Sequence, residues 1–274
     1  MSDARLPADF EAVMDDAWRR ARDIAGYIGE MESRALGMLA AGSPGQGLIV
    51  EIGSFKGKST VALASIAQHY GFGPVVSIDP HNAPSVTDPR LEPGESSYDV
   101  FRASLRGSGM EQQVEVHRST SRDAAAEWSR PIRLLWIDGD HTYAGAKEDF
   151  DLFSPYLSEG AIVAFHDTLF AFEGPIRVFV EQVLRSDQFG PARFFHSIGW
   201  AQYRPHDGIR FQNDRQRLAR QAAKLIPFVA GERRLEGLRK VRFKIRRFLV
   251  PHRVPSPAEW NAQIATQLGR FAAG

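Results

Sequence analysis

Residues 48–60 read LIVEIGSFKGKST, and this stretch decides the fold. Its first five residues have the short, largely apolar pattern of a buried β-strand, and the glycines at positions 53 and 57 mark a tight turn. From Ser59 to Tyr70 the apolar residues recur with helical spacing. A buried strand, a glycine-rich turn and a helix in this order predict a crossover unit of a parallel sheet.

The same alternation continues along the chain. We predict further strands and helices, in turn, at residues 75–78, 98–107, 113–117, 122–128, 132–137, 144–156, 161–165 and 175–185. Two strands at 192–198 and 200–203, separated by Gly199, then predict an antiparallel hairpin. The expected fold is α/β: a Rossmann-like, doubly wound sheet that is mostly parallel and ends in an antiparallel edge.

The sequence divides into three segments. Residues 1–45 are predicted to be helical with a break near Gly26 and Gly29, residues 46–205 form the α/β domain, and residues 206–274 form a helical extension. The extension holds 15 Lys and Arg against 5 Asp and Glu, whereas the rest of the chain holds 19 against 28. An acidic body of net charge −9 therefore carries a basic extension of net charge +10.

The composition excludes several kinds of site. The chain has no cysteine, so disulfides, zinc–thiolate sites and thiol nucleophiles are ruled out. It has no apolar run of about 18 residues that would cross a membrane, and its first residues lack a signal-peptide pattern. We therefore expect a cytoplasmic protein, with peripheral attachment to a membrane through the basic extension as an alternative.

The turn after the first strand comes close to a phosphate-binding loop. That loop needs four residues between its glycines, whereas Gly53 and Gly57 enclose three. A glycine-rich turn also lets the backbone approach a small ligand. Glu51 can attract a cationic amino group, and Asp79, at the end of the second strand, can bind ribose hydroxyls. S-adenosylmethionine (SAM) carries both groups and is the predicted cofactor.

Polar residues also follow the fourth and fifth strands. Asp138, Asp140 and His141 come after one strand, and His166 and Asp167 come after the other. Asp138, His166 and Asp167 predict a site for Mg²⁺ or Mn²⁺. Such an ion lowers the pKa of an acceptor hydroxyl, and either His141 or Asp140 can serve as the base that removes its proton.

Four motifs, at residues 50–60, 77–80, 137–143 and 165–167, resemble those of class I SAM-dependent methyltransferases. They are most similar to the small-molecule and sugar O-methyltransferase branch, which includes macrolide-sugar methyltransferases and cephalosporin hydroxylase-like proteins. The resemblance covers roughly residues 26–205 and implies a seven-stranded sheet. The cofactor-binding residues that it implies are Glu51, Gly53, Ser54, Asp79, Ser119, Thr120 and Asp138.

The resemblance also bears on the metal and the base. In the family an acid after strand four and two adjacent residues after strand five bind the metal, which implies Asp138, His166 and Asp167 here. His166 departs from the Asp-Asp or Asp-Asn pair that is usual in relatives. In catechol-type relatives the base lies three residues after the first ligand, at His141, and in sugar-modifying relatives two residues after it, at Asp140. The resemblance leaves both candidates open. It also matches Glu32 to an acidic position that often precedes the first strand.

Together these observations predict a metal-assisted O-methyltransferase that acts on a hydroxyl of a sugar, a glycan or another small molecule. One alternative is an RNA-directed methyltransferase recruited by the basic extension, and another is a non-catalytic SAM-binding protein at a membrane surface. Nucleic acid is the less favoured acceptor because the body of the chain is acidic. The acids at 138, 140 and 167 argue against a loss of catalysis.

Two further segments invite an interpretation. Residues 80–97 form a long aperiodic loop, which predicts a lid over the substrate. In the extension Leu238, Val241, Ile245 and Phe248 form an apolar stripe at helical spacing among Arg and Lys residues. Such a helix can pack on the domain or on a second subunit of a homo-oligomer, lie on an anionic membrane surface, or bind acidic glycans or nucleic acid.

Overall fold

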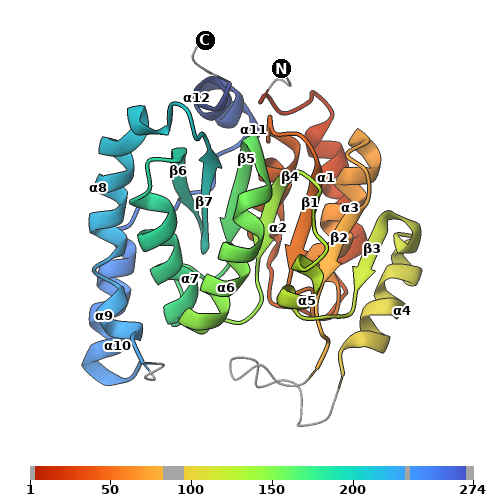
Figure 1. Cartoon of the computed structure of the whole chain (residues 1–274), viewed down its shortest axis with the longest axis horizontal. Coiled ribbons are helices and arrows are strands. Elements are labelled where there is room, and N and C mark those ends of the chain that lie inside the picture. Colours follow the sequence, from red (N-terminus) through yellow and green to blue (C-terminus); the bar gives the residue numbers. More distant parts are fainter. Residues whose placement is uncertain (1–3, 83–95, 232–234, 270–274) are drawn as a thin grey trace.

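A computed structural model of the chain describes residues 4–82, 96–231 and 235–269. A central sheet lies between two layers of helices (Figure 1). Most of the predicted lid, at residues 83–95, lies outside the described residues, so the lid stays a prediction.

The sheet has seven strands in the order β3-β2-β1-β4-β5-β7-β6. The first five in this order pair in parallel, and β7 is antiparallel to both of its neighbours. The strands are β1 (Leu48–Ile52), β2 (Val75–Ile78), β3 (Val114–His117), β4 (Ile132–Ile137), β5 (Leu157–Phe165), β6 (Phe189–Phe195) and β7 (Ile198–Tyr203). This arrangement confirms the predicted doubly wound sheet with an antiparallel edge.

The α-helices are α1 (Phe10–Ala21), α2 (Glu30–Ala41), α3 (Lys58–Tyr70), α4 (Tyr98–Ser108), α5 (Ser121–Ala125), α6 (Tyr143–Phe153), α7 (Glu173–Val178), α8 (Gln212–Ala222), α9 (Ile226–Val229), α10 (Gly237–Phe248), α11 (Pro257–Glu259) and α12 (Ala265–Leu268). Short 3₁₀ turns lie at Glu111–Gln113, Ser154–Tyr156 and Gly208–Phe211, and π-helical turns at Phe179–Leu184 and Trp260–Ile264. None of the described helices has both the length and the apolar composition needed to cross a bilayer.

The terminal hairpin differs from its prediction in one respect. The turn lies at His196 and Ser197 rather than at Gly199, which is inside β7. His196 takes the left-handed conformation that the turn requires, at φ 55°. Gly199 is small for a packing reason instead, because a Cβ there would lie 2.9 Å from side-chain atoms of Phe179 and Thr168. The prediction of a turn at Gly199 is therefore wrong, because this glycine is required by close packing and not by a turn.

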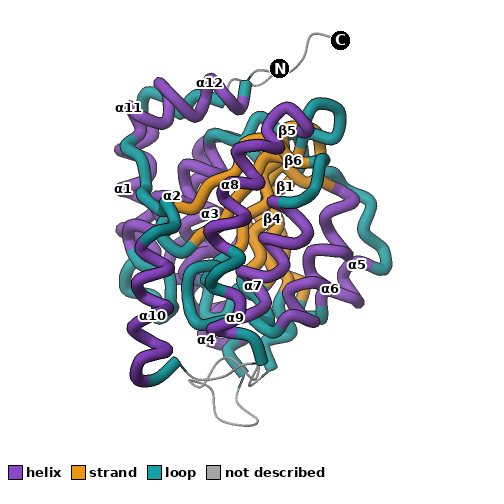
Figure 2. Tube along the Cα trace, turned by 90° about the vertical axis from the view of Figure 1, so that its left-hand side faces the viewer, coloured by secondary structure: helices purple, strands orange, loops and turns teal. Residues whose placement is uncertain are grey.

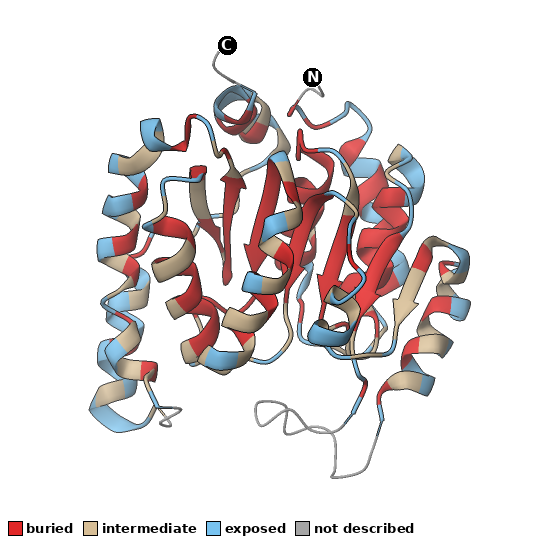
Figure 3. Cartoon of the chain, viewed as in Figure 1, coloured by how far each residue is buried: buried red, intermediate tan, exposed pale blue. Residues whose placement is uncertain are grey.

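The central strands β2, β1, β4 and β5 are largely buried on both faces of the sheet, whereas the edge strand β3 is only partly buried (Figure 3). One apolar cluster packs α1, α2 and α3 against one face, and a second packs α6, α7 and α8 against the other. Strand order reverses between β1 and β4, which pair directly. In doubly wound sheets ligands bind at the carboxyl ends of the strands beside such a reversal, so the fold places a site there.

The basic extension packs against the domain. On α8, Arg215 is buried and donates hydrogen bonds to the carbonyl oxygens of Ser186 (2.6 Å) and Phe189 in the domain. Farther along, Trp260 is fully buried on the opposite face of the sheet, where its ring lies 6.0 Å from that of Trp200 and its Nε1 donates to the carbonyl of Ala4 (2.9 Å). The extension thus packs in the helical layers on both faces of the sheet. Its C-terminal part also holds Ala4, the first described residue, in place through the Trp260 hydrogen bond.

We predict that Trp260→Ala lowers the free energy of unfolding by about 3–5 kcal/mol, because it opens a cavity between the extension and the sheet. Phe248→Ala is the matched control: Phe248 belongs to the same extension but is 82 % exposed, so its loss should change stability by less than about 0.5 kcal/mol. Urea denaturation measures both values. Equal stabilities for the two variants would show that the extension does not support the domain.

Candidate functional site

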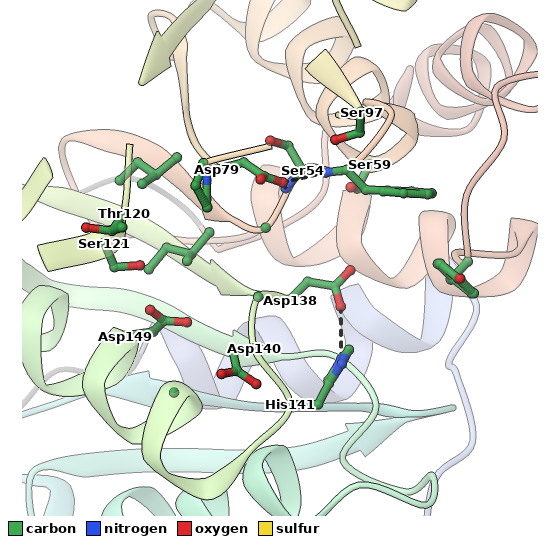
Figure 4. Close-up of a pocket in the computed structure, with 18 of the residues that line it drawn as sticks. Ser54, Ser59, Asp79, Ser97, Thr120, Ser121, Asp138, Asp140, His141 and Asp149 are labelled. Atoms are coloured by element: carbon green, nitrogen blue, oxygen red, sulfur yellow. Dashed lines mark hydrogen bonds and ion pairs between the residues drawn. The ribbon is translucent and has the colours of Figure 1, made fainter. Parts of the chain in front are cut away.

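A cavity of about 720 Å³ opens at the carboxyl ends of the strands (Figure 4). Its walls come from the loops that follow β1, β2, β3 and β4, from the segment between α1 and α2, and from the loop after β5. Figure 4 shows acidic and hydroxyl side chains from several of these loops around one space. This is the volume and position expected of a small-molecule site in a doubly wound sheet.

The loop after β1 is shaped by a glycine and by an acid from the neighbouring strand. Gly53 has φ 84°, and a Cβ there would lie 2.3 Å from the carbonyl oxygen of Asp138, so β1 and β4 can end side by side only with glycine at this position. Asp79 Oδ2 accepts hydrogen bonds from the backbone N–H groups of Ser54 (2.9 Å) and Phe55 (2.8 Å). Asp79 thereby holds the loop open toward the cavity.

Glu51 lies behind this loop rather than on the cavity wall. It is fully buried, and its Oε2 accepts a hydrogen bond from Thr60 Oγ1 (2.5 Å), while Oε1 has no hydrogen-bond partner among the described residues. Burial raises the pKa of the Glu51 carboxyl to about 8. The group is an acid that a nearby cation would ionise.

Two carboxylates and an imidazole meet at the ends of β4 and β5. Ligand atoms of Asp138, His141 and Asp167 all lie within 4.8 Å of one another. His141 Nε2 is 3.6 Å from Asp138 Oδ1 and 3.5 Å from Asp167 Oδ2, and it makes no hydrogen bond to a described residue. The His141 ring stacks on Phe172 at a centroid distance of 4.4 Å. These three side chains offer a set of possible metal ligands, of which Figure 4 shows Asp138 and His141 pointing toward each other.

His166, the third predicted metal ligand, lies behind this cluster and takes a different role. Its Nδ1 donates a hydrogen bond to Asp138 Oδ1 (2.9 Å), and its Nε2 lies 3.5 Å from Glu32 Oε1. Burial lowers the pKa of His166, but the charges of Asp138 and Asp167 outweigh burial and raise it well above its usual value. Both imidazoles therefore lie beside the two carboxylates. The group of ligand atoms that could share one ion is Asp138, His141 and Asp167, and metal binding by His166 stays a prediction.

Glu32 connects this cluster to the N-terminal helices. Glu32 lies in the first turn of α2, and its Oε1 accepts hydrogen bonds from His196 Nδ1 (2.7 Å) and from the Ser197 hydroxyl in the β6–β7 turn. Burial alone would raise the pKa of Glu32, but the nearby His166 imidazole and the hydrogen bond from His196 hold it well below its usual range. Glu32, the acid that the resemblance matched, thus connects helix α2 to the β6–β7 turn and to His166.

Asp140, the other base candidate, is exposed and turns toward α6. Its Oδ1 accepts a hydrogen bond from the Thr142 N–H (2.9 Å), and its carboxylate lies against Gly145 at the start of that helix. Figure 4 shows it directed away from His141 and toward Asp149. Of the two candidates, His141 is the one that belongs to the carboxylate cluster.

Asp149 is a cavity residue that the sequence analysis missed. It lies on the buried side of α6, and burial, aided by the nearby carboxylates of Asp140 and Glu148, raises its pKa to about 7. The sequence does contain a signal for its burial: Ala146 and Phe153, which lie three residues before and four residues after Asp149 on the same face of the predicted helix, are apolar.

Most of the remaining predicted cofactor-binding residues line the cavity, and one does not. Gly53, Ser54, Asp79, Thr120 and Asp138 line the cavity. Thr120 also caps α5, since its hydroxyl oxygen accepts a hydrogen bond from the Asp123 N–H (3.2 Å). Ser119 is not among the lining residues.

Residues 50–168 match the family model described as a methyltransferase domain. Among solved structures, the chain is similar to Rv0187 from MTB in a cofactor-bound form, at 18 % identity and a TM-score of 0.52 over 73 % of this chain and 89 % of that one. It is also similar to the O-methyltransferase TomG from Streptomyces achromogenes in complex with SAM, at 17 % identity and 0.51 over 70 % and 89 %, and to the O-methyltransferase NovP, at 12 % and 0.53 over 71 % and 98 %. At these identities the likeness to solved structures establishes the shared fold.

The raised pKa of Glu51 predicts how stability depends on pH. Between pH 4.5 and about 8 the folded protein keeps this proton while the unfolded chain loses it, so Glu51 makes the folded state less stable as pH rises through that window. Glu51→Gln, which cannot ionise, should raise the unfolding temperature at pH 8 by at least about 2 °C and leave it nearly unchanged at pH 4.5.

Thermal unfolding at the two pH values, without added ligand, measures this difference. Glu159→Gln, which removes an exposed carboxylate from β5, provides the control for the same substitution at an exposed position. A parallel response of Glu51→Gln would contradict the assigned pKa.

Proposed function

We propose that this chain, of which residues 50–168 match a methyltransferase-domain model, is a class I SAM-dependent methyltransferase that transfers a methyl group to a hydroxyl of a sugar or another small molecule with the help of a divalent cation. The observation that carries the proposal is the cluster of Asp138, His141 and Asp167 beside the cavity. TomG and NovP, which share the fold, are O-methyltransferases, and this supports an oxygen acceptor.

The SAM end of the cavity is the loop after β1. Asp79 Oδ1 receives one hydrogen bond, from the His81 N–H (2.6 Å), and a carboxylate oxygen can accept a second, so Asp79 can still bind a ribose hydroxyl. The unpartnered Oε1 of Glu51 supplies negative charge behind the loop for the cationic amino group of SAM. Asp149 and Thr120 line the part of the cavity toward α5 and α6, where we place the adenine.

We expect Asp79→Ala to weaken SAM binding at least tenfold, about 1.4 kcal/mol or more. The variant loses both a ribose acceptor and the hydrogen bonds that shape the loop at Ser54 and Phe55. Isothermal titration calorimetry with SAM measures the change, and Asp151→Ala, which removes an exposed carboxylate from α6, is the control. Unchanged affinity in Asp79→Ala would remove Asp79 from the SAM site.

The residues at the acceptor end fit a divalent cation. They offer two carboxylates and an imidazole nitrogen that is buried without a hydrogen-bond partner among the described residues. Carboxylates suit Mg²⁺ and Mn²⁺, and the imidazole shifts the preference toward Mn²⁺. A cation held by Asp138, His141 and Asp167 would lower the pKa of an acceptor hydroxyl and orient its oxygen toward the SAM methyl group.

The chain's own side chains prepare this end of the cavity. The His166 imidazole fixes the orientation of Asp138 through its hydrogen bond, and Phe172 covers one face of His141 and limits the access of water. In the reaction the acceptor oxygen bonds to the methyl carbon, the carbon–sulfur bond breaks, and S-adenosylhomocysteine leaves. The hydroxyl proton needs an acceptor: His141 lies at the cluster and can take the proton only if its Nε2 does not bind the cation, and Asp140 faces α6.

Metal removal tests this arrangement. Excess chelator should abolish turnover while SAM stays bound, and Asp138→Ala and Asp167→Ala should each lower kcat on the order of a thousandfold. The binding of Mn²⁺, followed by electron paramagnetic resonance, separates the two roles of His141. If His141 is a ligand, His141→Ala should lower the affinity for Mn²⁺. If His141 is the base, His141→Ala should lower the rate and leave the affinity for Mn²⁺ unchanged.

Asp140→Ala is the matched control for this cluster, because its carboxylate follows the same strand but faces α6. It should keep wild-type affinity for Mn²⁺. Full turnover in excess chelator would contradict the metal proposal, and acid–base catalysis by His141 would then be the remaining mechanism.

A further inference from the structure

Helix α10 is attached to the rest of the protein by one face. Phe243 on this face is 5 % exposed and its ring lies 6.3 Å from that of Phe228. Arg239 donates hydrogen bonds to the carbonyl oxygen of Phe228, at 2.6 Å and 3.0 Å, and the guanidinium of Arg247 lies 4.7 Å from the Phe170 ring centre. The helix is therefore fixed in orientation, and its opposite face has a defined direction.

That opposite face is apolar and uncovered. Leu238 is 76 % exposed and Phe248 82 % exposed, and Val241, Ile245 and Leu249 are each more than half exposed. Spacings of three and four residues place these side chains on one side of the helix, about half a turn away from Phe243. Of the nine large hydrophobic residues that are exposed in the described structure, four thus lie on this one helix and a fifth, Leu249, directly follows it, so the stripe is a surface feature and not part of the core.

Cations border the stripe on both sides. Arg242 and Arg246 lie one helical turn apart along one border, and Lys240 and Lys244 lie one turn apart along the other. All four are exposed, and none forms an ion pair with a described residue. The helix contains no acidic residue. An apolar stripe between two cationic borders is the pattern of a helix that lies in the plane of an anionic membrane surface.

We propose that α10 docks this protein on an anionic lipid surface, with the stripe among the lipids and the four border cations against their head groups. A second copy of the chain fits the helix poorly, because a two-fold contact would place the cationic borders of both copies together. Phosphates of a nucleic acid would pair with the cations but would leave the five apolar side chains against charged groups.

Docking through α10 also gives the catalytic cavity a fixed position at the surface. Helix α10 lies at the lower left of Figure 1, toward the end of the molecule where the parallel strands have their carboxyl ends, and runs up one side in Figure 2. Through Arg247 its inner face contacts Phe170, in the same loop that carries Asp167 and Phe172. The loop on the acceptor side of the cavity therefore packs directly against the docking helix.

Vesicle flotation with the full-length protein tests the proposal. The protein should float with vesicles made of equal parts phosphatidylcholine and phosphatidylglycerol and should not float with phosphatidylcholine alone. Lys240→Gln combined with Lys244→Gln should weaken binding about thirtyfold, since each cation near the surface contributes about fivefold. Ile245→Ser combined with Phe248→Ser should weaken it at least about tenfold.

Each double variant has a matched control outside α10. Arg217→Gln with Arg220→Gln removes two exposed cations from α8, and Met31→Ser with Ile209→Ser removes two exposed apolar side chains elsewhere; both should bind like the wild type. If the apolar variant loses stability, the charge variant carries the test alone.

Three results would overturn the proposal. They are equal binding to neutral and anionic vesicles, no binding to either, and α10 variants that bind like their controls. A dimer in analytical ultracentrifugation that Ile245→Ser with Phe248→Ser dissociates would also overturn it, because the stripe would then be a subunit interface.

Discussion

A buried imidazole holds the site together. His166 lies between Glu32 of α2 and Asp138 at the end of β4, and next to it in sequence is Asp167. Three carboxylates this close would repel one another and take up protons if no positive charge were near. The raised pKa of His166 keeps it charged among them and helps to lower the pKa of Asp138 and of Glu32, whereas burial raises the pKa of Asp167.

The same contacts explain why the N-terminal helices belong to the site. Glu32 accepts hydrogen bonds from His196 and Ser197, so α2 is tied to the turn of the antiparallel hairpin as well as to the cluster. At the end of β2, Asp79 fixes the loop after β1 through backbone hydrogen bonds, and Gly53 lets that loop approach β4. At both ends of the cavity, acidic side chains therefore accept hydrogen bonds from groups of the protein itself, and their oxygens can still accept further hydrogen bonds from a ligand.

The basic extension combines two tasks that its sequence does not separate. Arg215 and Trp260 are buried and join the extension to opposite faces of the sheet, whereas Leu238 and Phe248 point into solvent. The charge excess of residues 206–274 reflects the cations of α10 and its neighbours. The part of the extension that stabilises the fold and the part that presents a surface are thus different helices.

The sequence by itself determined the order and type of the elements, because period-two and period-3.6 patterns are local. It gave the bounds of β1, β2 and β4 as the structure has them, and it brought Asp138, His141 and Asp167 to neighbouring strand ends. It misplaced the hairpin turn at Gly199, since nothing local distinguishes a glycine that makes a turn from one that packs against Phe179. Only the tertiary structure turned His166 inward and His141 toward the carboxylates, buried Asp149, and left the stripe of α10 uncovered. Those outcomes depend on which residues distant in sequence come to lie beside each side chain, and periodicity carries no information about that.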